Sequence, residues 1–130
     1  MVDFNHSATA FSVIDQKGAF AGGVIAPGLA SSMNALASSA AQLVPPTLHV
    51  PDQVLGRSTA DAIVTGVVLG EVLRADGFVD ALWNELGEKM KLVATGRFAS
   101  LVVPRSAHSF AVEPHLALLG LHRLWELNDK

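Results

Sequence analysis

The sequence predicts an α/β fold, in which helices cover a sheet with an antiparallel edge. Two apolar, β-branched segments near the start are separated by a short turn, which is typical of an antiparallel pair of strands. After them, segments with the apolar spacing of helices alternate with short strand-like segments. The order is therefore two strands and a helix, then a strand and a helix, then short strands with further helices.

Residues 2–15 are predicted as the first strand and residues 20–26 as the second, with the turn sequence DQKG between them. Pro27 ends the second strand because proline has no N–H for the ladder. From residue 29 to residue 43, apolar side chains recur every three or four residues, as in an amphipathic helix. The helix start after Pro27-Gly28 leaves free N–H groups, which either bind an anion or belong to a purely structural turn.

Two prolines, at positions 45 and 46, end this helix, and residues 47–50 are predicted as a third, short strand at a sheet edge. Ser58 is predicted to cap a long helix, with Asp61 three residues on. Gly66 and Gly70 lie four residues apart on this helix, so we expect another element to approach that face closely. The predicted apolar stripe of the helix consists of Ile63, Val67, Gly70, Leu73, Phe78, Leu82 and Leu86.

The last part of the chain alternates between strands and helices. Strands are predicted at residues 91–95 and 109–112, and a short helix at residues 98–103, ended by Pro104. Pro114 is predicted to open the final helix, at a position where proline is tolerated. Its packing side chains are expected to be Leu116, Leu119, Leu124 and Leu127.

This order of elements is that of a ribonuclease H-like domain, a mixed sheet with flanking helices that also occurs in the actin and sugar kinase superfamily. The likeness concerns the fold and assigns no chemistry. With 130 residues, no internal repeat and no low-complexity linker, residues 1–130 are predicted to form a single domain.

Composition narrows the class of protein. Half of the residues are hydrophobic and 16% are charged, which indicates a packed globular chain with some apolar surface for a partner. The net charge of −3, without a basic stripe, argues against nucleic acid as a partner. Apolar stretches such as residues 62–70 are shorter than the ~20 residues that span a bilayer, so we expect no membrane partner. The absence of cysteine and of a signal peptide fits a cytoplasmic location.

Common motifs of active sites are absent from the sequence. It contains neither a GxxxxGK phosphate loop nor a GxGxxG dinucleotide fingerprint. Residues 56–60 come near the GxSxG nucleophile elbow, which would make Ser58 a hydrolase nucleophile, but a helix cap explains Ser58 better. His115 and His122 lie two helical turns apart, roughly 10 Å, too far to hold one metal ion.

Five segments, in order, resemble the C-terminal half of type III pantothenate kinases. They are VDFNHSATAF from residue 2, FAGGVIAPGL from residue 20, GRSTADAIVTGVVLG from residue 56, LVATGRFASL from residue 92 and LALLGLHRLWELN from residue 116. The resemblance covers essentially the whole chain. It implies a duplicated actin-like fold and a transferase that moves the γ-phosphate of ATP to pantothenate, the first step of coenzyme A biosynthesis.

The resemblance also implies roles for single residues. Asp3 stands where the family binds a monovalent cation such as potassium, although it could instead cap nearby backbone. Thr59 stands at the threonine that contacts pantothenate, often across the dimer interface, although it could simply cap the helix. Ser7 falls at the ATP-contacting threonine, and Gly96 in the TGG motif near the nucleotide.

Two departures from the family's pattern affect the nucleotide site. The family's DFGT motif is here Asp3-Phe4-Asn5-His6-Ser7, in which Asn5 replaces the glycine and one residue is added. Where the family usually has TGG, Arg97 follows Gly96, and its guanidinium either clashes with ATP or reaches a phosphate.

The family's DxGNT phosphate loop and the general-base Asp of its GADR motif do not occur in this sequence. General-base catalysis is typically worth 10²–10⁴-fold, so no catalytic residue is assigned and the chain alone is expected to be inactive as a kinase. The resemblance therefore implies a homodimer, or a heteromer with an N-terminal-half kinase subunit that supplies both motifs. The alternatives are a non-catalytic binding or assembly protein that keeps the fold but has lost ATP binding, and an unrelated hydrolase that uses Ser58.

Overall fold

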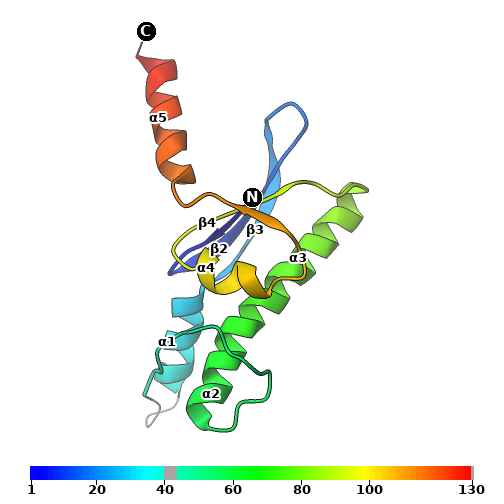
Figure 1. Ribbon diagram of the computed structural model, residues 1–130. Coiled ribbons are helices and arrows are strands. Elements are labelled where there is room, and N and C mark those ends of the chain that lie inside the picture. The colour runs from blue at the N-terminus through cyan, green and yellow to red at the C-terminus, as the bar shows by residue number, and fades with distance from the viewer. Residues whose placement is uncertain (40–43, 130) are drawn as a thin grey trace.

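A computed structural model describes residues 1–39 and 44–129 of the chain. Its strands form one five-stranded sheet in the order β3-β2-β1-β4-β5 (Figure 1). β2 is antiparallel to both β1 and β3, whereas β1, β4 and β5 are parallel to one another. The predicted α/β class with an antiparallel edge is confirmed. The strands are β1 (Val2–Phe4), β2 (Ala8–Ile14), β3 (Phe20–Pro27), β4 (Leu92–Thr95) and β5 (Phe110–Val112).

The helices flank this sheet and include one long rod. α2, η1 and α3 follow one another without a break and form that rod, in which η1 is a π-helical segment (Figure 1). Ser58 caps it as predicted, because its Oγ accepts a hydrogen bond from the Asp61 N–H at 3.1 Å. The helices are α1 (Leu29–Ser39), α2 (Thr59–Val64), η1 (Thr65–Leu69), α3 (Gly70–Leu86), α4 (Ala99–Val102), the 3₁₀ turn η2 (Val103–Arg105) and α5 (Leu116–Asn128).

A single hydrophobic core lies against one face of the sheet. Val2 is paired with Phe11 on one side and with Ala94 on the other, so that these three side chains share a face. The rod covers this face, and α1 adds Leu29 and Met33 to the same core. Burying these side chains supplies the main driving force for the fold.

Residues 2–15 do not form one strand, contrary to the prediction. A turn at residues 5–7 divides them, so that β1 folds back on β2 and Asp3 pairs with Ala10. Residues 47–50 also form no strand. Prolines before and after them remove donors from the ladder, and Leu48 packs against the core without sheet pairing. Helix α1 is described as far as Ser39, and the predicted continuation to residue 43 lies outside the described residues.

The buried stripe of the rod agrees only in part with the predicted one: Val67 is buried, and Ile63, Phe78 and Leu82 pack against the core. Leu73, predicted to be inside, is 71% exposed, whereas the fully buried positions include Val64, Val68 and Val72. The π-helical turn explains the difference, because it takes more residues per turn than an α-helix and moves the buried positions along the rod.

Helix α5 extends away from the rest of the molecule (Figure 1). None of its residues is buried, so the predicted packing of Leu116, Leu119, Leu124 and Leu127 is wrong for this chain by itself. Pro114 lies in the turn before the helix, which begins at Leu116. Within residues 1–39 and 44–129, no helix combines the length and the apolar character that crossing a bilayer requires.

Candidate functional site

A hollow of about 440 Å³ lies at the carboxyl ends of the parallel strands β1, β4 and β5. Ligands of α/β proteins commonly bind at this edge of a sheet. We call it the Asp3 hollow. Its lining includes Asp3, Asn5, Gly96, Arg97, Ser100 and Ala117. The structure therefore brings together two of the residues that the sequence singled out, Asp3 and Gly96, from segments more than ninety residues apart.

Gly96 lets the end of β4 pass directly over Asp3. Its φ of +92° is a conformation that side chains disfavour. A Cβ atom at this position would lie 2.4 Å from Asp3 Oδ1 and 2.5 Å from the Phe4 carbonyl oxygen. The Phe98 N–H then donates to that carbonyl at 3.0 Å. Only glycine fits here, so Gly96 forms the floor of the hollow through its backbone.

Asp3 is held by the side chain of Asn5. The Asn5 amide Nδ2 donates to both carboxylate oxygens of Asp3, at 2.9 Å each. Asp3 is thus held by a side-chain amide, and the described contacts include no backbone cap of the kind that the sequence left open. Asn5 stands where the resembled family has glycine, and it occupies the carboxylate that a cation would use.

The chemistry of the donors limits which metal ion the hollow could hold. Asp3 is its only lining carboxylate, and Thr95 and Ser100 add neutral hydroxyl oxygens. Within the described residues no three or more His, Cys, Asp or Glu side chains cluster in the way that a metal ion requires. One carboxylate with neutral oxygens fits a weakly bound monovalent cation better than a divalent one.

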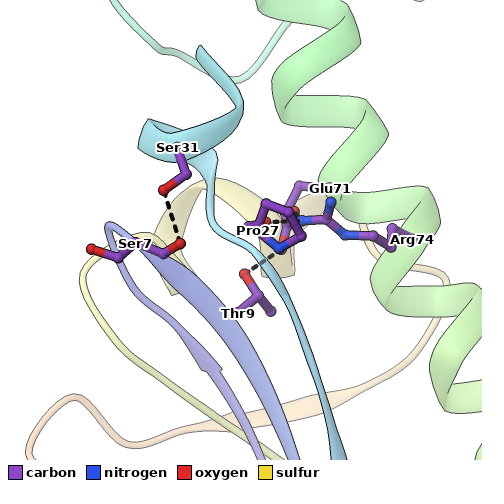
Figure 2. A network of polar contacts seen from close by, with 6 residues as sticks. All are labelled: Ser7, Thr9, Pro27, Ser31, Glu71 and Arg74. Atoms are coloured by element: carbon purple, nitrogen blue, oxygen red, sulfur yellow. Dashed lines mark hydrogen bonds and ion pairs between the residues drawn. The ribbon is translucent and has the colours of Figure 1, made fainter. Parts of the chain in front are cut away.

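Ser7 lies in the β1–β2 turn, residues 5–7, but does not line the hollow. Its carbonyl oxygen accepts hydrogen bonds from Gly28 N–H at 3.0 Å and from Ser31 Oγ at 2.9 Å. Figure 2 shows the Ser7 side chain on the side of the turn away from Ser31. The exposed hydroxyl is therefore free of the contacts that hold the turn.

The start of α1 packs onto the β1–β2 turn at Gly28. A Cβ on Gly28 would lie 2.5 Å from the Asn5 carbonyl oxygen and 2.8 Å from that of His6. The Ser31 N–H donates to the His6 carbonyl at 3.3 Å. The N–H groups of Gly28 and Ser31 at this junction thus both donate to carbonyl oxygens of the β1–β2 turn. This supports a purely structural turn at Pro27-Gly28 over an anion-binding site.

Thr59 lies elsewhere, at the exposed start of α2. The cap of this helix is Ser58, so Thr59 does not serve as the cap. Beside it, a second hollow of about 250 Å³ is lined by polar side chains that include His49, Arg57 and Asp61. Thr59 is therefore not brought to Asp3 and Gly96 within this chain.

A buried polar network that was not predicted from the sequence lies between the rod and the sheet. Thr9 Oγ1 donates to Glu71 Oε1 at 2.5 Å, and Glu71 Oε2 pairs with Arg74 (Figure 2). Arg74 Nη2 also donates to the Pro27 carbonyl oxygen at 2.5 Å. Burial lowers the pKa of Arg74 by desolvation. A glutamate within the apolar run VVLGEVL was the available signal, because an acidic residue there needs a partner.

A second cluster ties α3 to the segment before β5. Ser106 Oγ donates to Asp76 Oδ1 at 2.5 Å, and the Ala107 N–H donates to Asp76 Oδ2 at 2.9 Å. His108 Nε2 lies 3.2 Å from Asp80 Oδ1, within ion-pair distance but without the alignment of a hydrogen bond. This cluster fixes the β4–β5 side of the sheet to the rod, and it does not reach the hollow.

Known proteins match this chain over most of its length. A family model described as type III pantothenate kinase matches residues 1–85. Curated type III pantothenate kinases of Frankia alni and Zymomonas mobilis are 43% and 35% identical to it, over 98% and 96% of this chain. The chain spans only about half of these relatives, 51% and 46% of their lengths.

A solved structure described as a conserved putative Baf family transcriptional activator from Campylobacter jejuni is similar with a TM-score of 0.67. The similarity covers 98% of this chain and 57% of that one, at 22% identity, and so concerns the fold alone. The match of the family model and the identity to the curated kinases decide the family. This chain belongs to the type III pantothenate kinase family.

Proposed function

We propose that this chain is the C-terminal half of a pantothenate kinase, a ribonuclease H-like unit that completes its active site with a polypeptide equivalent to the other half of the relatives. The observation that carries the proposal is the 43% identity across 98% of this chain but only 51% of the Frankia alni relative. The strand order, with β2 alone antiparallel, and the likeness of fold to the Campylobacter jejuni protein support the ribonuclease H-like fold.

In this proposal the Asp3 hollow faces the phosphates of ATP. The Ser7 hydroxyl contacts the nucleotide from the exposed β1–β2 turn, the backbone at Gly96 contacts it from the floor of the hollow, and Arg97 pairs with a phosphate. Asp3 holds a potassium ion once the Asn5 amide has turned away. The exposure of Ser7 and the position of Arg97 in the lining support these roles.

Helix α5 supports the need for a partner. Leu118, Leu121 and Trp125 are more than 60% exposed, and they lie on one broad apolar face of a helix that contacts little of its own chain. An isolated 13-residue helix is marginally stable in water. The half of the relatives that this chain does not span is the proposed occupant of this face. It would bring the phosphate loop and the general base to the hollow, next to Ala117.

A homodimer through the groove between α1 and the rod is part of the same proposal. Gly66 and Gly70 line this groove, and a Cβ on either would meet no atom of residues 1–39 and 44–129 within 4 Å. Thr59 lies on the same rod and would reach pantothenate bound at the neighbouring subunit. Sedimentation of the chain should show a dimer, and Gly66→Leu should weaken it. A monomer mass at all concentrations would count against this part.

A mixing experiment tests the main proposal. The chain is combined with the half of the Frankia alni enzyme that it does not match, and pantothenate-dependent ATP turnover is measured. We expect no turnover from either half alone and turnover in the mixture, rising with the concentration of either half. Thr59→Val should raise the KM for pantothenate more than the KM for ATP, because it removes a substrate hydroxyl contact.

The alternative is an assembly protein that has lost ATP binding, and one observation favours it: Asn5 already engages both oxygens of Asp3. Silence in a mixture whose halves are bound to each other would support this alternative. Recovery of turnover on Asn5→Gly would then identify Asn5 as the cause. Robust turnover by the chain alone would contradict both functions.

A further inference from the structure

A buried ionic pair on α3 lies outside the Asp3 hollow and has no part in the proposed chemistry. The side chain of Glu71 is 2% exposed and that of Arg74 29% exposed. Desolvation makes such a pair costly, and apolar residues of similar volume often pack at least as stably. The specific contacts of the pair, rather than its burial, therefore indicate what it contributes.

These contacts close a ring through the β1–β2 turn, of which Figure 2 draws Ser7, Thr9, Pro27, Glu71 and Arg74. Thr9, two residues after Ser7, donates to Glu71, and Glu71 pairs with Arg74. Arg74 donates to the carbonyl oxygen of Pro27. The next residue along the chain, Gly28, donates its N–H to the Ser7 carbonyl oxygen. The ring thus leaves the turn through Thr9 and returns to it through Gly28.

Residues 5–7 are exposed, and their own short-range bond, from the Asn5 N–H to the Ala8 carbonyl oxygen, is 3.2 Å long. The strand ladders hold the two ends of the turn, and the His6 ring lies 5.3 Å from that of Phe98. The bonds from Gly28 and Ser31 attach the middle of the turn to the start of α1. Arg74 fixes the peptide group just before Gly28 with a charge-assisted hydrogen bond, which is about twice as strong as a neutral one. Leu29 and Met33 anchor α1 in the core, and this bond holds the peptide group that leads into the helix.

We propose that Glu71 and Arg74 are positioning residues, which hold the β1–β2 turn in place for the nucleotide by way of Pro27 and Gly28. Glu71 orients the guanidinium, Arg74 fixes the Pro27 carbonyl, and Gly28 and Ser31 transmit this position to Ser7. The consequence for ATP rests on the proposed function, whereas the hold on the turn does not.

Hydrogen–deuterium exchange of the full chain tests the hold directly. In Arg74→Met, which keeps most of the apolar stem, we expect the Gly28 and Ser31 amides to exchange about tenfold faster, because their acceptors on the turn are no longer held in place. The double variant Glu71→Leu with Arg74→Met, which leaves no charge unpaired, should show the same acceleration at these two amides while the amides within α3 keep their rates. Arg105→Met, which removes an exposed arginine, is the matched control and should change neither set.

Kinetics of the mixed halves test the consequence for ATP. Arg74→Met should raise the KM for ATP about tenfold and leave the KM for pantothenate and the kcat within about twofold. A purely structural role would lower the apparent kcat through the folded fraction and leave both KM values alone. If the mixed halves are inactive even with wild-type sequence, the proposed function fails and the exchange result alone decides the positioning role.

Milder variants cover the case in which Arg74→Met does not fold. Thr9→Val removes the hydrogen bond from Thr9 to Glu71 with almost no change in side-chain volume. Arg74→Lys keeps a donor for either Glu71 or the Pro27 carbonyl oxygen. Each should accelerate exchange at Gly28 and Ser31, with Arg74→Lys the weaker. Unchanged exchange at both amides in every folded variant would overturn the proposal.

Discussion

The two sides of the Asp3 hollow differ in how they are held. On one side, hydrogen bonds from the start of α1 hold the β1–β2 turn, and the Glu71–Arg74 pair lies behind that contact. On the other side, α5 contributes Ala117 to the lining, and none of its residues is buried. The first side is organised entirely by contacts within this chain. The second side is a short helix with its apolar face exposed. A half-site can therefore be preorganised before the rest of the site is present, and preorganisation lowers the cost of binding when the rest arrives.

Removing one member of the buried pair should damage the organised side most. Glu71→Ala leaves the partly buried charge of Arg74 without its partner, and we expect a loss of about 3–5 kcal/mol in the free energy of unfolding. The double variant Glu71→Leu with Arg74→Met should lose much less, because no charge is then left unpaired. Urea unfolding of both variants measures the difference. Equal losses would mean that packing volume, not charge, dominates at this position.

Gly96 lies between the two sides, and Gly96→Ala should cost more than about 2 kcal/mol. The added methyl group would collide with Asp3 and Phe4, and the backbone conformation is one that alanine disfavours. Gly77→Ala provides the matched control: the site lies in α3 with no atom within 4 Å of the new Cβ, so it should gain up to about 1 kcal/mol. A similar loss in both variants would show that the close contact at Gly96 relaxes easily.

Potassium should have a smaller effect. If the cation binds Asp3 in the native state only, it should stabilise the chain by less than about 1 kcal/mol relative to a bulky organic cation at equal ionic strength. Asn5→Gly should enlarge the effect, because both oxygens of Asp3 are then free, and Asp3→Asn should abolish it. Thermal unfolding in the two salts measures it. An effect that persists in Asp3→Asn would place the cation elsewhere.

The α5 side should hardly contribute to the stability of the isolated chain. Leu121→Asp and Leu118→Asp should change the free energy of unfolding by less than about 0.5 kcal/mol, because both side chains are already exposed. The same variants should weaken binding to the other half of the Frankia alni enzyme at least tenfold in a titration. Arg123→Gln, on the polar side of α5, serves as the control. Unchanged binding in the Asp variants would exclude α5 as the docking surface.

Much of the fold could be predicted because its signals are local. Ser58 with Asp61 marks a helix start, and β-branched runs beside glycines and prolines mark most strands. The strand pattern did not place the turn at residues 5–7, because strand-like residues flank its three polar residues on both sides. Leu73 was wrongly placed inside because a π-helical turn leaves no simple periodic signal, although Val67 and Phe78 were placed correctly. Leu119 and Leu124 were expected inside because helical spacing shows an apolar face but not what covers it.

The candidate site, like the fold, could be predicted only in part. Asp3 and Gly96 were predicted from matching motifs, and the structure places them in contact although more than ninety residues separate them. The roles of Asn5 and Arg74 could not be predicted, since each depends on a partner fixed only by the tertiary structure. Asn5 donates to Asp3 through a side-chain geometry that the motif does not specify, and Arg74 donates to a carbonyl group 47 residues away.

The central position of β1 has a consequence for how the chain folds. β1, β2 and β3 are neighbours in sequence and can pair early, but β4 pairs with β1 only after a loop of nearly ninety residues has closed. Until then one edge of β1 is an unpaired strand next to an incomplete core. Open strand edges are templates for pairing with other chains. Aggregation during synthesis should therefore begin at this edge and should fall with any change that speeds the docking of β4.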